Sequence, residues 1–433
     1  MKYLPVDASL FVENRKKFCA ELPAGSLAIF HANDEMPRSA DQNFMFRQNP
    51  DLFYLSGIDQ EQTALMLFPD APEPKYREVL FIRKTNEHIK VWEGHKYTIE
   101  EAKAASGIKT VVWIDEFDAI VGMMMNRTNN VYLNLNENDR AANPVPYREL
   151  RFARDARERW PLHTYHRAAP IMTKLRMCKS QPEVDLIQHA CNITHKAFER
   201  VCRFVRPGVY EYEIEAEILH EFLRNRATGY AYYPIVASGE SACILHYQDN
   251  NRECRDGDLI LMDFGAEYAN YNADLSRTIP VNGRFTDRQR AVYDAVLRVM
   301  KAATAMLRPG LMMSDYNKEV GRLMTGELID LGLLNKADVD AQDPAKPLYK
   351  KYFMHGTSHH LGLDVHDLAD RYVPVQSGMV FTVEPGIYIP DEGIGIRLEN
   401  DVLVTDGEPK DLMGSIPLEA EAIEDLMNAT VPG

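Results

Sequence analysis

The chain has 433 residues and a net charge of −15, with 45% hydrophobic and 26% charged residues. This length predicts two domains, and the composition is typical of a soluble globular protein. The acidic balance argues against nucleic acid or an anionic membrane as a partner, because both would repel it. No stretch reaches the eighteen or more apolar residues of a membrane span, and the N-terminus lacks the apolar run of a signal peptide. The six cysteines show neither CxxC nor zinc-type spacing, so we expect buried reduced thiols in a cytoplasmic protein.

Short β-type runs alternate with mixed segments over residues 25–136. The runs are SLAIFHA (26–32), TALMLFP (63–69), EVLFIRK (78–84), VVWID (111–115) and VYLNLN (131–136), and a helix-like stretch, TIEEAKAA, occupies 98–105. This alternation predicts an α/β domain of moderate size, which we place at residues 1–172. Residues 137–170 are rich in Asn, Arg and Pro, and we expect them to form a connecting region.

A second domain is predicted at residues 173–433. Ser180 begins a Ser-x-x-Glu capping box with Pro in the first turn, so a helix should run to about Val205. The chain then repeats itself, because a helix ending in Arg-Pro-Gly leads to an amphipathic helix once within 180–226 and again within 286–331. Two halves related by a pseudo-twofold axis would give an α+β domain.

A pair of carboxylates follows each helix pair, in a stretch patterned as a β-hairpin. Asp263 and Glu384 each end an apolar strand six residues after a glycine, in GDLILMD and GMVFTVE. Their partners Asp274 and Glu399 return on the next strand. A buried lone carboxylate is strongly disfavoured unless it is paired or binds a metal. A pseudo-twofold that brings both pairs to one centre therefore predicts a metal site.

Four histidines fall within HGTSHHLGLDVHD (355–367). His359, after a Gly-rich turn, completes a set of four carboxylates and one imidazole, which suits two divalent ions such as Mn²⁺ that activate water. His355 and His366 could donate to a developing oxyanion or hold a substrate carbonyl. His360 is expected to be a polar loop residue that points the other way from His359.

Two further residues are candidates by position. His246, in ILHYQDN, comes just before the first acidic strand. Arg397 lies two residues before Glu399 and shares its strand face, so it could orient a ligand carboxylate. The alternative for Arg397 is an ordinary surface ion pair.

Five segments of the second domain resemble the pita-bread metallopeptidases, the superfamily of methionine aminopeptidase, prolidase and aminopeptidase P. The segments are ILHY (244–247), LMDFGAEYANYNADLSRT (261–278), HGTSHHLGLDVHD (355–367), VEPGIYIP (383–390) and GIRLEND (395–401). The resemblance covers roughly residues 175–425, and all five ligand positions fall in order within the motifs. It implies the pita-bread fold with its duplicated halves.

The resemblance also implies a role for each residue. Asp263 would bind one metal, and Asp274 and Glu399 would bridge both. His359 and Glu384 would complete the shell, with Glu384 also acting as a proton shuttle while the bridging water attacks the Xaa-Pro carbonyl carbon. The residues implied to contact the substrate, shape its site or support the ligands are His246, His366, His355, Arg397 and Tyr232, the last of which would line the proline-side pocket.

The upstream segment SADQNFMFRQNPDLFYLSGIDQEQTALML (39–67) is similar to the N-terminal domain of aminopeptidase P, which methionine aminopeptidases lack. That family hydrolyses the bond between any N-terminal residue and a following proline, so peptides with proline second are the implied substrates. Its members are homo-oligomers, dimers or tetramers, in which the N-terminal domain of a neighbour helps to close the active site. Asp41 and Trp92 match positions used in that way.

Two alternatives stay open at this point. Prolidase carries the same ligands but cleaves Xaa-Pro dipeptides only. A non-catalytic pita-bread binding protein is the other alternative, although such relatives typically lose ligands and this chain retains all five.

Overall fold

The computed structural model describes residues 2–138, 140 and 145–429. It divides into two compact units, Tyr3–Arg176 and Met177–Gly433, with Lys2 assigned to the second unit. The domain boundary expected after residue 172 lies inside helix α7 (Ala169–Met177). No helix within this described part combines the length and the apolar character that crossing a lipid bilayer requires.

Unit 1 is built on a mixed six-stranded sheet with the strand order β6-β5-β4-β1-β7-β8. The strands are β1 (Ser26–His31), β4 (Ala64–Leu67), β5 (Glu78–Ile82), β6 (Thr110–Trp113), β7 (Asn130–Leu133) and β8 (Thr164–Arg167), and a separate hairpin joins β2 (Pro37–Ser39) to β3 (Gln42–Asn43). β1 pairs antiparallel with β4 and parallel with β7, which is in turn parallel to β8. All of the sheet strands except β8 overlap a predicted β-type run, which confirms the α/β character of this unit.

Seven helices accompany the sheet within the described part of unit 1. They are α1 (Ala8–Glu21), α2 (Pro50–Ser56), α3 (Glu87–Glu93), α4 (Ile99–Ser106), α5 (Phe117–Met125), α6 (Arg148–Arg159) and α7. Phe117 of α5 packs edge-on against Phe81 of β5, with ring centroids 5.1 Å apart, and against Phe152 of α6 at 5.7 Å. Helices α5 and α6 therefore share one face of the sheet and complete its core.

The expectation that residues 137–170 only connect the domains is wrong for the described part of that segment. It contains α6 and β8, while residues 139 and 141–144 lie outside the described residues. β8 reads TYHR and is nowhere fully buried, because it is an edge strand, so it shows no alternation of apolar residues. α6 is rich in Arg and buries only Glu149, Phe152 and Ala156, so its apolar face is too narrow to stand out.

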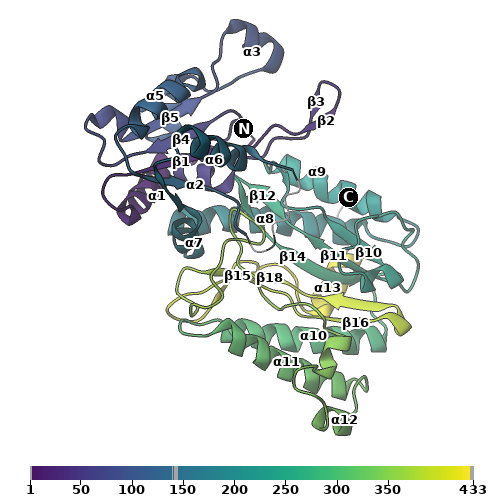
Figure 1. The fold of residues 1–433 in the computed structure, drawn as a ribbon. Coiled ribbons are helices and arrows are strands. Elements are labelled where there is room, and N and C mark those ends of the chain that lie inside the picture. Colours follow the sequence, from purple (N-terminus) through teal and green to yellow (C-terminus); the bar gives the residue numbers. More distant parts are fainter. Residues whose placement is uncertain (1, 139, 141–144, 430–433) are drawn as a thin grey trace. The chain divides into compact units, whose positions relative to one another are not determined.

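Two helix pairs frame unit 2. The helices are α8 (Gln181–Phe204), α9 (Glu211–Arg224), α10 (Asp287–Met306), α11 (Met313–Asp330), α12 (Lys336–Asp340) and α13 (Ala420–Asn428). Ser180 begins α8 with the predicted capping box, and Thr286 begins α10 with another. The α8–α9 pair and the α10–α11 pair lie on either side of the strands (Figure 1).

The strands of unit 2 form short antiparallel groups between these helices. One sheet contains β10 (Ile235–Ser238), β11 (Leu259–Phe264) and β14 (Leu275–Pro280), and another contains β15 (Val380–Val383), β18 (Asn400–Leu403) and β19 (Lys410–Asp411). The smaller groups are β9 (Gly229–Tyr230) with β12 (Ala266–Tyr268) and β13 (Tyr271–Asn272), and β16 (Gly386–Ile389) with β17 (Ile394–Arg397). Each half thus supplies a helix pair followed by an antiparallel strand pair, as the internal repeat predicts.

Candidate metal centre

Asp263 and Asp274 lie at the same end of one antiparallel strand pair. Asp263 belongs to β11, whose preceding residues are buried, and it is in register with Ser276 of β14. Asp274 comes immediately before β14. The hydroxyl of Tyr232 lies 2.6 Å from Oδ1 of Asp263 and is also hydrogen-bonded to Asp274. The strand pair therefore brings both carboxylates to one point.

Glu384 and Glu399 occupy the equivalent places in the second half. Glu384 directly follows β15 and Glu399 directly precedes β18, and these two strands pair with Val383 opposite Asn400. Glu399 is buried, at 2% exposed. The two halves thus present their acidic pairs through the same local geometry.

His359 is held with one ring nitrogen directed at the carboxylates. Its Nδ1 is 3.0 Å from the carbonyl oxygen of His360, and because a carbonyl can only accept, Nδ1 carries the hydrogen in the neutral ring. Its Nε2 then has a lone pair directed at the carboxylates, and it lies 3.5 Å from Asp274 and 3.8 Å from Glu384. Metal-binding histidines in proteins commonly show this arrangement, with the far N–H bound to a carbonyl.

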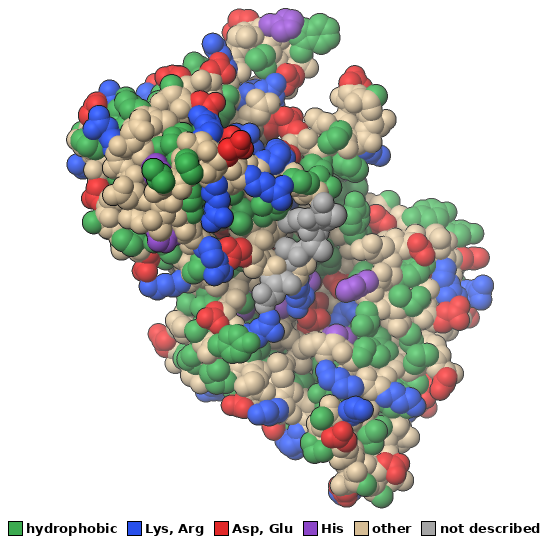
Figure 2. Space-filling view, in the orientation of Figure 1, with side chains coloured by type: hydrophobic (Ala, Val, Ile, Leu, Met, Phe, Trp, Pro, Cys, Tyr) green, Lys and Arg blue, Asp and Glu red, His purple; other side chains and the backbone are tan. Residues whose placement is uncertain are grey.

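Three of the predicted ligands come together tightly. One ligand atom from each of Asp274, His359 and Glu399 lies within 4.8 Å of the other two. On the face of unit 2 that Figure 2 presents, His side chains gather beside recessed acidic side chains. Asp263 and Glu384 adjoin this group through the contacts with Tyr232 and His359 described above.

Arg397 is bound to the centre rather than to a surface partner. The residue is 4% exposed, and its Nη2 donates to Asp263 Oδ2 at 2.6 Å. Its Nε donates to the hydroxyl of Ser276 at 2.8 Å, and its Nη1 to the hydroxyl of Tyr388 at 2.9 Å. All three guanidinium nitrogens are therefore engaged, and the group is fixed in orientation.

The electrostatics of the centre favour a bound cation. Burial, followed by the neighbouring carboxylates, raises the pKa of Asp274 and of Glu399 well above the usual range. Burial also raises the pKa of Glu384 to about 7. Carboxylates crowded into a buried space hold protons unless positive charge is supplied, and a divalent cation supplies it. The residues present therefore fit a divalent metal.

His355 is a neutral residue in the wall of the site. Burial, followed by the positive charge of Arg397, lowers the pKa of His355 to about 3. Its Nδ1 donates to the Gly356 carbonyl at 2.7 Å, so its Nε2 must accept the hydroxyl hydrogen of Tyr388, 2.8 Å away. A chain of hydrogen bonds therefore runs from Arg397 through Tyr388 to His355.

The remaining histidines take different positions. His366 is exposed, and its ring meets that of His359 edge-on with centroids 4.4 Å apart. His246 is exposed in the segment after the 3₁₀ turn Gly239–Cys243, and its charge contributes to the lowered pKa of His355. His360 is buried, with its ring centroid 4.2 Å from that of Phe381, so the expectation of a polar loop residue was wrong.

Two of the predicted substrate-side residues belong to unit 1. Asp41 lies in the turn between β2 and β3 and is exposed. Trp92 lies on α3 and is 75% exposed, with its ring 6.0 Å from that of His88. An exposed Trp suits a contact with another molecule better than a place in the core.

Three residues that contact the ligands or Arg397 were not singled out from the sequence. Tyr388 and Ser276 bind Arg397, and Asp401 binds the backbone of Asp274. Asp401 carries the signal that identified Asp263, an acid within an apolar strand, and could have been found by the same argument. The hydroxyl contacts depend on how the two halves meet, which the sequence does not display.

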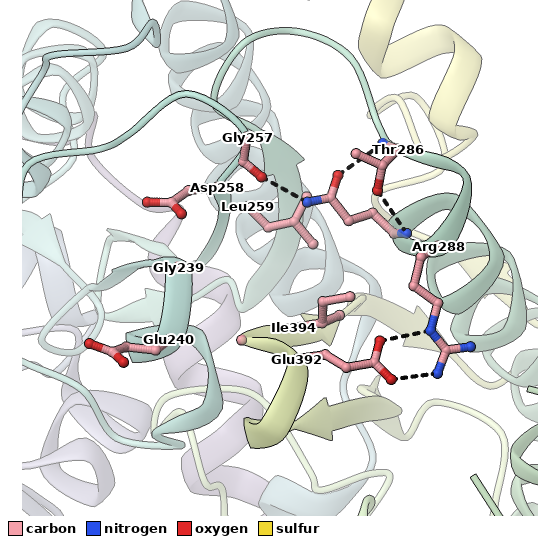
Figure 3. A pocket seen from close by; sticks show the side chains of 11 residues that line it. Gly239, Glu240, Gly257, Asp258, Leu259, Thr286, Arg288, Glu392 and Ile394 are labelled. Carbon is pink, nitrogen blue, oxygen red and sulfur yellow. Dashed lines mark hydrogen bonds and ion pairs between the residues drawn. The ribbon is translucent and has the colours of Figure 1, made fainter. Parts of the chain in front are cut away.

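A cavity of about 470 Å³ elsewhere in unit 2 contains none of the predicted site residues. Arg288 and Glu392 on one wall are joined by two hydrogen bonds (Figure 3), each of 2.7 Å. Gln289 is hydrogen-bonded to Thr286 and donates to the carbonyl of Gly257. These contacts tie the start of α10 to β11 and to the turn before β17. The cavity is thus a by-product of packing between elements, with its charged pair already satisfied.

Comparison with known proteins agrees with this geometry. The model described as metallopeptidase family M24 matches residues 185–406, and the model described as the aminopeptidase P N-terminal domain matches residues 11–132. The Xaa-Pro aminopeptidase of Escherichia coli (strain K12) is 36% identical over 432 residues, 97% of each chain. The Xaa-Pro dipeptidase of Rattus norvegicus is 28% identical, over 98% of this chain and 94% of that one. Zinc-substituted E. coli aminopeptidase P in complex with product superposes with a TM-score of 0.87 and 33% identity, covering 98% of this chain and 99% of that one. These matches confirm the predicted α/β N-terminal domain and pita-bread C-terminal domain.

Proposed function

Because this chain belongs to metallopeptidase family M24 and carries the aminopeptidase P N-terminal domain, we propose that its acidic centre is the active site of a Xaa-Pro aminopeptidase. The protein is a metallo-aminopeptidase, a hydrolase acting on the bond between an N-terminal residue and a following proline. The observation that carries the assignment of the site is the convergence of Asp274, His359 and Glu399 within 4.8 Å.

The metal ligands in this proposal are Asp263, Asp274, His359, Glu384 and Glu399, with Asp274 and Glu399 shared between two ions. Four carboxylate oxygens and one imidazole favour hard divalent ions, and Mn²⁺ is our choice. When bound by these residues, two such ions would supply a water molecule of lowered pKa and a positive charge for the scissile carbonyl oxygen. The position of His359 Nε2, 3.5 Å from Asp274, and the raised pKa values of the buried carboxylates support this ligand set.

Protons and substrate atoms are handled by the residues around the ligands. Glu384 would take a proton from the attacking water and return it to the leaving nitrogen, as a carboxylate placed beside the ligands can do. His366 and His246 are exposed and can donate to the substrate carbonyl and to the tetrahedral intermediate. His355, kept neutral, would shape the wall and hold Tyr388, while Arg397 would keep Asp263 in place.

Two further parts of the proposal concern the substrate and the assembly. Tyr232 would present its ring to the proline, since its hydroxyl is already bound to Asp263 and Asp274. Asp41 and Trp92 of a neighbouring copy would help to close the site in a homodimer or homotetramer, and the exposure of Trp92 supports this role. We place the protein in the cytoplasm.

The decisive experiment compares peptides that differ at one point. With Mn²⁺ present, Ala-Pro-Ala should be cleaved, Ala-Ala-Ala should be cleaved little or not at all, and N-acetyl-Ala-Pro-Ala should not be cleaved. The blocked peptide should fail because an acidic, cation-centred pocket attracts a free amine and has no room for an acetyl group. Efficient cleavage of Ala-Ala-Ala would point instead to a broad aminopeptidase.

Prolidase is the second candidate, and the similarity to a Xaa-Pro dipeptidase over nearly the whole chain is the observation that favours it. The lower identity, 28% against 36% for the E. coli aminopeptidase, ranks it second. The dipeptide Ala-Pro separates the two candidates, because a prolidase would cleave Ala-Pro and leave Ala-Pro-Ala intact.

A further inference from the structure

Asp274 and Glu399, the two carboxylates proposed to bridge the ions, are each anchored by the opposite half of the domain. The backbone N–H of Asp274 donates to Oδ2 of Asp401 at 3.0 Å. The backbone N–H of Glu399 donates to the carbonyl of Ser276 at 3.1 Å. Ser276 and Asp401 occupy equivalent places, two residues after the carboxylate of their own half. The bonds therefore cross between the halves.

Ser276 also fixes the side chain of Glu399. Its hydroxyl is completely buried and donates to Glu399 Oε2 at 2.7 Å. The hydroxyl oxygen of Ser276 also accepts a hydrogen bond from Nε of Arg397 at 2.8 Å. A guanidinium can only donate, so the single hydroxyl hydrogen of Ser276 is left for Glu399. Hydrogen bonds to charged partners are the stronger kind, and here they hold the hydroxyl from both sides.

Asp401 is unusual because it is a buried carboxylate and no described positively charged group binds it. It is completely buried on β18, and its Oδ2 accepts from the thiol of Cys191 at 3.4 Å as well as from the Asp274 amide. Its Oδ1 is buried without a hydrogen-bond partner among the described residues. Leaving such an oxygen unsatisfied is costly. What Asp401 provides against this cost is the hydrogen bond that it accepts from the Asp274 amide.

We propose that Ser276 and Asp401 are positioning residues that hold Asp274 and Glu399 at the separation the two cations require. The inference rests on the proposed function, because it concerns the same ligands. Its specific consequence is that removing either residue weakens cation binding beyond any loss of stability. Loss of a group that orients a metal ligand typically costs about 10–100-fold in metal affinity or activity.

The first test uses a pair of matched serines. Ser238 is also completely buried, on β10 of the same sheet, and its hydroxyl donates to Glu211 Oε1 at the same distance of 2.7 Å. Mn²⁺ is titrated calorimetrically into chelator-treated wild type, Ser276→Ala, Ser276→Thr and Ser238→Ala, and the melting temperature of each metal-free protein is recorded. Ser276→Ala should bind Mn²⁺ about 10–100-fold more weakly. Ser276→Thr, which keeps a hydroxyl, should recover most of the affinity, and Ser238→Ala should keep wild-type affinity even if it melts earlier.

The second test applies the same logic to Asp401. Asp401→Ala removes the acceptor of the Asp274 amide, whereas Cys191→Ala removes only the thiol on the same oxygen. Weaker Mn²⁺ binding in Asp401→Ala alone supports the proposal, with kcat falling more than KM rises. Mn²⁺ affinities for Ser276→Ala and Asp401→Ala equal to those of their controls would overturn it. If wild type itself neither bound Mn²⁺ nor cleaved Ala-Pro-Ala, the proposed function would be at fault instead.

Discussion

At the scale of single residues, Asp274 and Glu399 should be the least replaceable, because each would be shared by both cations. We expect Asp274→Ala and Glu399→Ala each to abolish turnover. The fold should be largely kept, since ions in a preformed catalytic site usually add less stability than a structural zinc does. Peptide cleavage, metal content and circular dichroism together check this. The exposed Asp256, just before β11, provides a control, and Asp256→Ala should remain active. Near wild-type turnover in either ligand variant, with one metal bound, would refute the shared role.

His366 should behave differently from the ligands, because its ring approaches His359 edge-on from an exposed position. We expect His366→Ala to keep its metal content while turnover falls about 100-fold, the scale of losing one positioned donor. Metal analysis and kcat on Ala-Pro-Ala measure the two effects. His220→Ala, which removes an exposed histidine on α9, should change neither. Loss of metal together with activity would make His366 a ligand or a structural residue.

Residue chemistry accounts for which site residues could be predicted. Asp263 and Glu384 were identifiable because an acid that closes a buried apolar strand needs a partner. Arg397 was expected either to orient a ligand or to form a surface pair, and its buried contact with Asp263 agrees with the first expectation. The hydroxyl of Tyr388 could not be placed, because a tyrosine in a strand is ordinary until its partner across the fold is known.

At the scale of elements, prediction succeeded where the sequence carries a clear helix start or an apolar run. The capping box at Ser180 begins α8 at the predicted residue, and the apolar runs of unit 1 became β1, β4, β5, β6 and β7. It failed for α6 and β8, because an Arg-rich helix and a polar edge strand carry little apolar periodicity. Tertiary contact with Phe117 decides the place of α6, and no local pattern encodes that contact.

A buried ion pair should control the loop that carries His366. Lys179, just before α8, donates to Asp367 at 2.9 Å, and both side chains are 1% exposed. The backbone of Gly362 passes so close that a Cβ there would lie 2.2 Å from Asp367 Oδ2. We expect Lys179→Ala to lower the free energy of unfolding by about 3–5 kcal/mol, because it removes the cation of a buried ion pair and leaves the charge of Asp367 uncompensated by Lys179.

Urea unfolding of wild type and Lys179→Ala measures that loss, and a double variant supplies the control. Lys179→Met combined with Asp367→Leu removes both charges at similar volume and should recover most of the stability. Turnover should stay low in both, since His366 loses its neighbouring anchor. A double variant as unstable as the single one would show that packing, rather than the loss of the ion pair, is responsible.

At the scale of the whole molecule, stability should respond to pH through the acidic centre. Burial raises the pKa of Glu384 from an ordinary 4.5 to about 7. A carboxyl whose pKa is raised by folding stabilises the fold at low pH, and this contribution is lost as the pH rises through the folded value. Between about pH 4.5 and 7 the metal-free wild type should lose up to about 3 kcal/mol relative to Glu384→Gln.

Urea unfolding of both proteins with chelator, at pH 5 and at pH 8, checks this prediction. Excess Mn²⁺ should reverse the trend in wild type, because an ion that displaces protons binds more tightly as the pH rises. A stability difference between the two proteins that stays constant over this range would mean that Glu384 titrates normally.

The two-domain plan was predictable from the length of the chain and the change of pattern at Ser180. The duplicated halves were predictable because the helix pair and the acidic strands recur along the chain. That the halves meet at their acidic pairs was predicted, but the individual hydrogen bonds between them were not, since these join strands more than a hundred residues apart in the chain. The bonds that join Ser276 to Glu399 and Asp401 to Asp274 are of this kind. Assembly into dimers or tetramers is likewise a property of surfaces, and it stays a prediction.

The crossing of bonds between the halves has a consequence for the timing of synthesis. A ribosome adds roughly 5–20 residues per second, so on the order of ten seconds separate the emergence of Asp274 from that of Glu399. During that interval Asp274 is made but Asp401, which holds its amide, does not yet exist. The sheet of unit 1 needs only residues up to Arg167 and can form early. The complete ligand set, with the bonds that hold it, therefore exists only after almost all of the chain has been translated.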